Sequence, residues 1–164
     1  MSLLHVKKIF VHVAIIWMTG ISLGLFVNFV RPSGRLPWLY PWSTLVESRA
    51  FAENIPLIHT EALYNELMAG SVILLDARPL TEYQAGHLPG ALSLPVDAFD
   101  QHFSEVQLFL FSEQPIVTYC SGPSCDDALR LALRLRDEGF SAVSLYLPGV
   151  QDWQATGLPL EAMR

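Results

Sequence analysis

Residues 116–127 read IVTYCSGPSCDD, and this stretch decides the fold that we predict for the chain. Its first four residues form an apolar run of strand length, and a helical pattern rich in Arg and Leu follows its last residue. The predicted strand therefore delivers Cys120 to a short loop that ends at the start of a helix. The partial positive charge of a helix N-terminus, together with loop amides that point inward, favours a thiolate over a thiol. We therefore expect Cys120 to be a reactive cysteine.

Strand-like and helix-like segments alternate on both sides of this stretch. Apolar runs predict strands at residues 72–75, 91–94, 116–119 and 143–147, and helices are predicted at residues 60–69, 80–85, 97–111 and 126–138. Alternating units of this length predict an α/β domain with an open, mainly parallel sheet and helices on both faces. Functional sites in such sheets lie at the carboxyl ends of strands, where Cys120 falls.

The N-terminal segment has the composition of a membrane anchor. Residues 9–30 contain no charged side chain, and a helix of this length spans about 33 Å, close to the thickness of the hydrocarbon core of a bilayer. The run is too long for a cleavable signal peptide, and no small-residue cleavage site precedes Arg31. We predict a short tail and one transmembrane helix within residues 1–30, a juxtamembrane linker at 31–53 and a folded domain at 54–164.

Flanking charges favour one orientation of this helix. Lys7 and Lys8 on a short N-terminal tail favour a cytoplasmic N-terminus, although Arg31 and Arg35 partly balance them. The chain would then be a single-pass protein of a bacterial inner membrane, with its C-terminal domain in the periplasm. Within residues 9–30, a pair of glycines at positions 20 and 24 (Gly20 and Gly24) would allow a partner helix to pack closely, and two glycines without a partner are the simpler interpretation.

The overall composition excludes two classes of site. The formal net charge is −6, and residues 31–164 carry 8 arginines against 16 acids, so no basic surface for nucleic acid is expected. Cys120 and Cys125, which fall in one short window, cannot form the disulfide framework of a secreted scaffold. They are also two ligands short of a structural zinc site, so we expect no metal.

Several motifs together resemble one family. Residues 74–78 (LLDAR), Glu82-Tyr83 and residues 86–91 (GHLPGA) resemble the first half of a rhodanese domain. The strand that ends in Tyr119-Cys120 and the later Gly149, Trp153 and Pro159 positions resemble the second half, so the likeness extends over about residues 54–161. The resemblance implies a rhodanese-like, open, mainly parallel five-stranded sheet with helices on both faces, here preceded by one transmembrane helix.

The resemblance also implies a sulfurtransferase that needs no cofactor. Cys120 would take the outer sulfur of a small donor such as thiosulfate, carry it as a persulfide, and pass it to an acceptor thiol or an acceptor protein. The anionic persulfide would be bound by loop amides. The candidate binding residues of this loop are Ser121, Gly122, Ser124, Cys125 and Asp126. In the family's pattern Asp76, Arg78 and His87 support the loops around the site and do not react.

Three departures from the family's pattern leave alternatives open. The loop 120–126 contains no Lys or Arg, Pro123 has no amide to donate, and Cys125 stands where many members have an arginine or a small polar residue. Cys125 is a candidate resolving thiol, and with it the domain would be a dithiol redox element or sensor. A catalytically silent binding module is a further alternative. Phosphatase chemistry is rejected because Asp126 would repel a phosphate.

Overall fold

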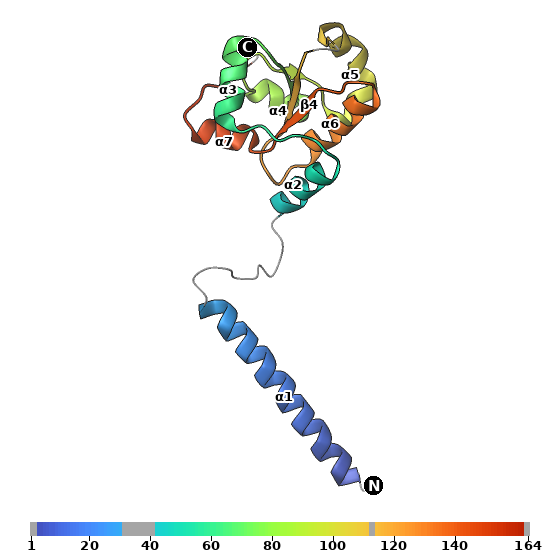
Figure 1. Cartoon of the computed structure of the whole chain (residues 1–164), viewed down its shortest axis with the longest axis vertical. Helices are drawn as coiled ribbons and strands as arrows, with labels where there is room; N and C mark the ends of the chain where they lie inside the picture. The colour runs from blue at the N-terminus through green and yellow to red at the C-terminus, as the bar shows by residue number, and fades with distance from the viewer. Residues whose placement is uncertain (1–2, 31–41, 112–113, 163–164) are drawn as a thin grey trace. The chain divides into compact units, whose positions relative to one another are not determined.

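The computed structural model describes residues 3–30, 42–111 and 114–162, and the chain divides into two compact units, Met1–Leu39 and Tyr40–Arg164 (Figure 1). The described part of the first unit is helix α1 (Leu3–Val30). Its window Lys7–Gly24 has a mean hydropathy of 1.2, so the helix is long and apolar enough to cross a membrane. A signal sequence near the N-terminus would satisfy the same criteria. The membrane anchor therefore stays a prediction, and Arg31 and Arg35 lie outside the described residues.

The second unit alternates helices and strands along the chain. Its elements are α2 (Trp42–Ala52), α3 (Thr60–Ala69), β1 (Ile73–Asp76), α4 (Leu80–Ala85), β2 (Leu92–Ser93), η1 (Val96–Ala98), α5 (Phe99–Val106), η2 (Gln107–Phe109), β3 (Ile116–Tyr119), α6 (Asp127–Asp137), β4 (Val143–Tyr146) and α7 (Gly149–Ala155). The strands form one sheet in the order β2-β1-β3-β4, and every pairing is parallel. This arrangement confirms the predicted parallel α/β fold.

The sheet has four strands within the described residues, where five were expected. At the edge beside β4, a single parallel bridge joins Leu57 to Leu145. The Leu145 amide donates to the Pro56 carbonyl at 2.8 Å, and the Ile58 amide donates to the Leu145 carbonyl at 3.1 Å. Pro56 has no N–H to donate, so the pairing cannot continue toward the N-terminus. The fifth strand is therefore reduced to this bridge.

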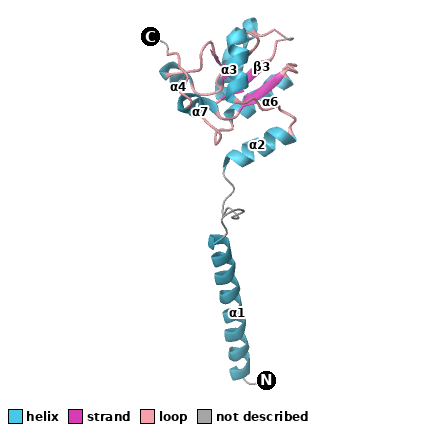
Figure 2. Cartoon of the chain, turned by 60° about the vertical axis from the view of Figure 1, so that its left-hand side comes forward, coloured by secondary structure: helices cyan, strands magenta, loops and turns pink. Residues whose placement is uncertain are grey.

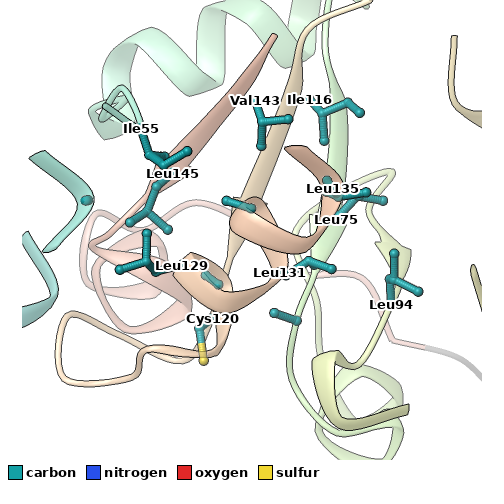
Figure 3. Close-up of a cluster of buried hydrophobic side chains, with 14 of the residues drawn as sticks. Ile55, Leu75, Leu94, Ile116, Cys120, Leu129, Leu131, Leu135, Val143 and Leu145 are labelled. Atoms are coloured by element: carbon teal, nitrogen blue, oxygen red, sulfur yellow. The ribbon is translucent and has the colours of Figure 1, made fainter. Parts of the chain in front are cut away.

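Helices cover both faces of the sheet (Figure 2). Successive strand residues point to opposite faces, so Leu75 and Leu145 belong to one buried cluster whereas Leu74 and Tyr146 belong to the other. The first cluster includes side chains of α2, α5 and α6, and the second includes side chains of α3 and α7. Figure 3 shows the first cluster, with Cys120 among its aliphatic side chains. Cys120 is thus anchored in the hydrophobic core.

Residues 42–52 form helix α2, whereas the sequence predicted a juxtamembrane linker over residues 31–53. Val46 and Ala50, which are four residues apart on one face of α2, are 1% and 0% exposed and belong to the same cluster as Cys120. Residues 42–52 are therefore part of the folded unit, because this helix buries a narrow apolar stripe against it. The rest of the predicted linker, 31–41, lies outside the described residues.

Candidate active site

The reactive loop connects β3 to α6 at the carboxyl end of the sheet. Cys120 follows the last residue of β3, and α6 begins at Asp127. The buried hydroxyl of Thr118 donates a hydrogen bond to the Ala128 carbonyl at 2.9 Å, which joins the end of β3 to the first turn of α6. Both ends of the loop are therefore held in place by the core.

Cys120 and Cys125 form a disulfide across this loop. Their Cα atoms lie 6.2 Å apart, within the range that a disulfide spans. The Cys125 amide donates to the Gly122 carbonyl at 3.0 Å, which closes a four-residue turn with Pro123 in the second position that proline favours. This turn folds the chain back and brings the two cysteines together. The sequence alone left their pairing open.

The turn also changes the predicted anion-binding loop. We expected the Cys125 amide to face a bound persulfide, but the turn commits this amide to Gly122. Within the described residues, the amides of Ser121, Gly122, Ser124 and Asp126 have no hydrogen-bond partner. Four of the five predicted loop positions therefore keep an amide that can donate to an anion.

Helix α7 supports the loop from the other side. The amides of Val150 and Gln151 donate to the carbonyls of Cys120 and Ser121, each at 3.0 Å. Gly149, with a φ of +67°, makes this approach possible, because a Cβ atom at this position would lie 2.4 Å from the Cys120 carbonyl oxygen. The glycine that was recognised as part of a family motif thus sits directly against the reactive loop.

Asp127 lies against both sulfurs of the disulfide, and no sequence pattern pointed to it as a residue of the site. Its Oδ2 lies 3.5 Å from the Cys125 sulfur and 4.0 Å from the Cys120 sulfur, while its Oδ1 accepts a hydrogen bond from Arg130 at 3.0 Å. Burial raises the pKa of the Asp127 carboxyl, the Arg130 guanidinium lowers it, and the nearby carboxylates of Asp97 and Asp126 raise it. The net direction is upward, so the site makes ionisation of this carboxyl less favourable.

In the part of the chain that the structure describes, one group has the composition of a metal site, namely Cys120, Cys125 and Asp127. Ligand atoms of Cys120, Cys125 and Asp127 lie within 4.8 Å of one another. A metal binds thiolates, however, and both sulfurs are bonded to each other in this structure. Any metal would therefore require the reduced pair, and the expectation of no metal stays a prediction.

An arginine from a distant segment reaches the loop. Arg49 of α2 lies 3.2 Å from the Asp126 Oδ2, although 77 residues separate the two in the chain. On the far side, Arg130 also pairs with Asp97 at 2.8 Å. The loop has no cation of its own, and both arginines that approach it are already paired with carboxylates. No sequence signal linked Arg49 to this loop.

Two of the three predicted loop-supporting residues lie beside the site. The buried Asp76 carboxylate accepts hydrogen bonds from the backbone and the guanidinium of Arg78, and Arg78 also donates to the Gly86 carbonyl at 2.7 Å. Arg78 lies 3.8 Å from the Glu82 carboxylate, which accepts a hydrogen bond from the Ser121 hydroxyl at 3.2 Å. This chain of contacts connects the buried ion pair to the reactive loop through Glu82.

His87 lies in a different environment. Its Nδ1 is 2.8 Å from the Tyr83 carbonyl, its ring stacks on Tyr83 with centroids 3.9 Å apart, and its Nε2 is 3.9 Å from the Glu161 carboxylate. Backbone hydrogen bonds also join His87 to Glu161 in an antiparallel bridge. His87 therefore joins the C-terminal segment to the end of α4, and among the described residues its ring contacts Tyr83 and Glu161 rather than loop 120–126.

Solved structures share the fold of this chain. The BH2092 protein of Bacillus halodurans matches 73% of this chain and 85% of its own, with a TM-score of 0.60 and 23% identity. A thiosulfate sulfurtransferase of Pseudomonas aeruginosa gives a TM-score of 0.60 at 22% identity, over 76% of this chain and 23% of its own. A variant of EanB that carries a cysteine persulfide, solved with ergothioneine, matches at a TM-score of 0.57 and 25% identity, over 65% of this chain and 28% of its own.

Two relatives are similar in sequence. The HTH-type transcriptional regulator Rv0324 of Mycobacterium tuberculosis is 40% identical over 96 residues, and the putative sulfur carrier protein YrkF of Bacillus subtilis is 29% identical over 104 residues. These matches cover 57% and 62% of this chain, but they span only 39% and 52% of the relatives. The sequence model of the rhodanese-like domain family matches residues 59–156, from the start of α3 to the end of α7. Because this match covers more than half of the chain, the chain belongs to the rhodanese-like domain family.

Proposed function

We propose that the domain transfers sulfane sulfur and that Cys120 carries the sulfur as a persulfide. The observation that carries this proposal is the position of Cys120, held between the end of β3 and the N-terminus of α6 with free loop amides around it. Likeness to a putative sulfur carrier protein and to a structure with a cysteine persulfide supports the same chemistry.

The transfer takes two displacement steps. The Cys120 thiolate attacks the outer sulfur of the donor, the donor's own bond to that sulfur breaks, and the rest of the donor leaves with the electron pair. An acceptor thiolate then attacks the outer sulfur of the persulfide and releases the Cys120 thiolate. The amides of Ser121, Gly122, Ser124 and Asp126 would stabilise the negative charge of the persulfide. These steps require that the Cys120–Cys125 disulfide is first reduced.

A dithiol redox element is the second candidate, and the disulfide favours it. With a persulfide on Cys120, the Cys125 thiolate would attack the Cys120 sulfur, the bond to the outer sulfur would break, and hydrosulfide would leave. Cys120 and Cys125 are oxidised together to the disulfide while the outer sulfur is reduced to sulfide. A thiol reductant then returns both cysteines to the starting state.

The apolar helix α1 is the basis for a proposed location of this chemistry. We propose that residues 9–30 anchor the chain in a bacterial inner membrane with the C-terminal domain in the periplasm, supported by the length of α1 and by Lys7 and Lys8. A partner helix would approach through Gly20 and Gly24, at which a Cβ atom would meet nothing within 4 Å. Protease digestion of intact spheroplasts tests the orientation, because only a periplasmic domain would be degraded.

Intact mass spectrometry of the full chain tests the function. The wild type, Cys120→Ser and Cys125→Ser would be reduced, freed of reductant, held in a non-ionic detergent and exposed in turn to thiosulfate, to polysulfide and to the persulfide of cysteamine, so that both anionic and cationic sulfur donors are tested. A persulfide carrier gains the mass of one sulfur atom in Cys125→Ser and none in Cys120→Ser. A redox element instead loses two hydrogens in the wild type alone. A chain that shows neither change would be the binding module, and the proposal would be wrong.

A further inference from the structure

The charges around the disulfide do not cancel on the side of Asp127. Arg130 bonds both to Asp127 at 3.0 Å and to Asp97 at 2.8 Å, so one guanidinium serves two carboxylates. Asp97 is 80% exposed at its side chain and therefore presents its negative charge to an approaching molecule. This side of the site carries one carboxylate in excess.

The side of Ser121 carries a second excess carboxylate. Glu82 accepts the hydrogen bond of Ser121, and its nearest cation is Arg78 at 3.8 Å. Arg78 is already paired with the buried Asp76 at 2.6 Å, so it offsets that carboxylate first. Arg49 and Asp126 neutralise each other. The ion pairs connected to the reactive loop thus contain five carboxylates and three guanidinium groups, an excess of two negative charges.

A pocket that is lined by Asp127, the residue in contact with the disulfide, is part of this negative surface. It has a volume of about 270 Å³, enough for a small organic molecule or one side chain. The carboxylates of Asp97 and Asp127 and the ring of His102 line it together with the apolar side chains of Ala77, Pro79, Leu80, Pro95 and Ala98. Neither cysteine lines this pocket, but Asp127, which does, contacts both sulfurs, so the pocket adjoins the disulfide through the Asp127 carboxylate.

We infer that this site selects its sulfur partners by charge, taking thiols that carry a positive charge beside the sulfur and disfavouring anionic ones. The inference rests on the proposed function, because it concerns the partner that exchanges with Cys120 and Cys125. A cation in the pocket lies against Asp97 and Asp127, whereas an anion meets two carboxylates in a partly desolvated space. Dianionic thiosulfate is accordingly a poor donor for this domain, and the natural partner is a thiol or persulfide with a basic neighbour.

Reduction of the disulfide is the exchange that reveals this selection. A thiolate attacks the more exposed Cys125 sulfur, a mixed disulfide forms there, and the bond to Cys120 breaks with its electron pair on Cys120. A second thiolate then attacks the sulfur of the bound thiol, which releases a small symmetric disulfide and the Cys125 thiolate. Two thiols are thus oxidised and both cysteines are reduced, with no other reactant.

The test compares three thiols that differ in charge. The oxidised full chain in a non-ionic detergent would be reduced by cysteamine, 2-mercaptoethanol or 3-mercaptopropionate at low ionic strength. Each rate constant would be calculated per thiolate. It would then be divided by the rate constant of the same thiol with a neutral small disulfide, 2-hydroxyethyl disulfide, so that differences in intrinsic thiol reactivity cancel. We expect cysteamine to exceed mercaptopropionate by about tenfold, and we expect 0.5 M salt to compress this ratio to about twofold.

Two matched variants assign the effect to the pocket. Asp97 and Asp100 are similarly exposed, and each pairs with an arginine of α6, but only Asp97 lines the pocket. Asp97→Asn should lower the ratio of the cysteamine rate to the mercaptopropionate rate about threefold, and Asp100→Asn should leave it unchanged. Equal rates for the three thiols, or the same loss in both variants, would overturn the inference. Persulfide formation on Cys120 is measured separately, so failure of the proposed function would be recognised independently.

Discussion

Replacement of Gly149 by alanine gives the sharpest test of how the reactive loop is held. An added Cβ would lie 2.4 Å from the Cys120 carbonyl oxygen and 2.7 Å from the Gly122 amide nitrogen, and both of these atoms are backbone. The left-handed φ of +67° costs an alanine about 1 kcal/mol, and the collision adds about 1–3 kcal/mol. We therefore expect Gly149→Ala to lower the free energy of unfolding by about 2–4 kcal/mol.

Gly157→Ala is the matched control for this change. Gly157 also has a left-handed φ, of +79°, but a Cβ at this position would meet nothing within 4 Å. Gly157→Ala should therefore lower the free energy of unfolding by only about 1 kcal/mol, which is the cost of the left-handed φ for an alanine. Urea denaturation of the oxidised full chain, followed by near-ultraviolet circular dichroism, measures both losses. The displaced loop of Gly149→Ala should also be reduced faster by dithiothreitol. Equal losses of stability in the two variants would refute the close packing of α7 on the loop.

Three further predictions follow from the packing of the domain. Opening the Cys120–Cys125 disulfide, by reduction or by the double serine variant, releases a six-residue loop and should cost about 2 kcal/mol without unfolding the domain, as denaturation with and without reductant would reveal. Arg78→Ala leaves the buried Asp76 carboxylate unpaired and should cost about 3–5 kcal/mol in the same assay, and a loss below 1 kcal/mol would contradict the ion pair. Burial raises the pKa of Tyr146 to about 12, so the folded chain keeps a proton that the unfolded chain loses near pH 10, and stability should fall as pH rises between these values. Tyr146→Phe should make that fall in melting temperature shallower.

The parts of the fold with strong local signals were predictable from the sequence. The strand at 116–119 and the helix at 80–85 match β3 and α4, because a run of β-branched and aromatic residues and a glycine stop define their limits. Helix α2 was missed, because Val46 and Ala50 are its only buried side chains among residues 45–52, where burial is described, and two apolar positions make a weak pattern. The fifth strand was overestimated, because the effect of Pro56 on pairing depends on which strand lies beside it.

The candidate site likewise has features that local sequence order predicts and features that only long-range contacts create. The position of Cys120 between a strand end and a helix start follows from local order along the chain, and so does the turn that Pro123 favours. The contacts of Arg49 with Asp126 and of Glu82 with Ser121 join segments that are distant in the chain, and no periodicity or motif predicts them. Asp127 was recognised only as a residue of the helix start, since its contact with the two sulfurs depends on the closed turn.

The redox conditions around the domain determine whether the Cys120–Cys125 pair is a disulfide or two free thiols. In an oxidising compartment the disulfide persists, and Cys120 has no free thiolate to attack a donor. Sulfur transfer there would require a thiol partner that first reduces the pair, and the inferred charge preference would favour a partner with basic groups. In a reducing compartment the pair is open from the start, and the same charges act on the sulfur donor itself. Under the proposed function, partner charge would therefore act through the reductant in an oxidising compartment and through the sulfur donor in a reducing one.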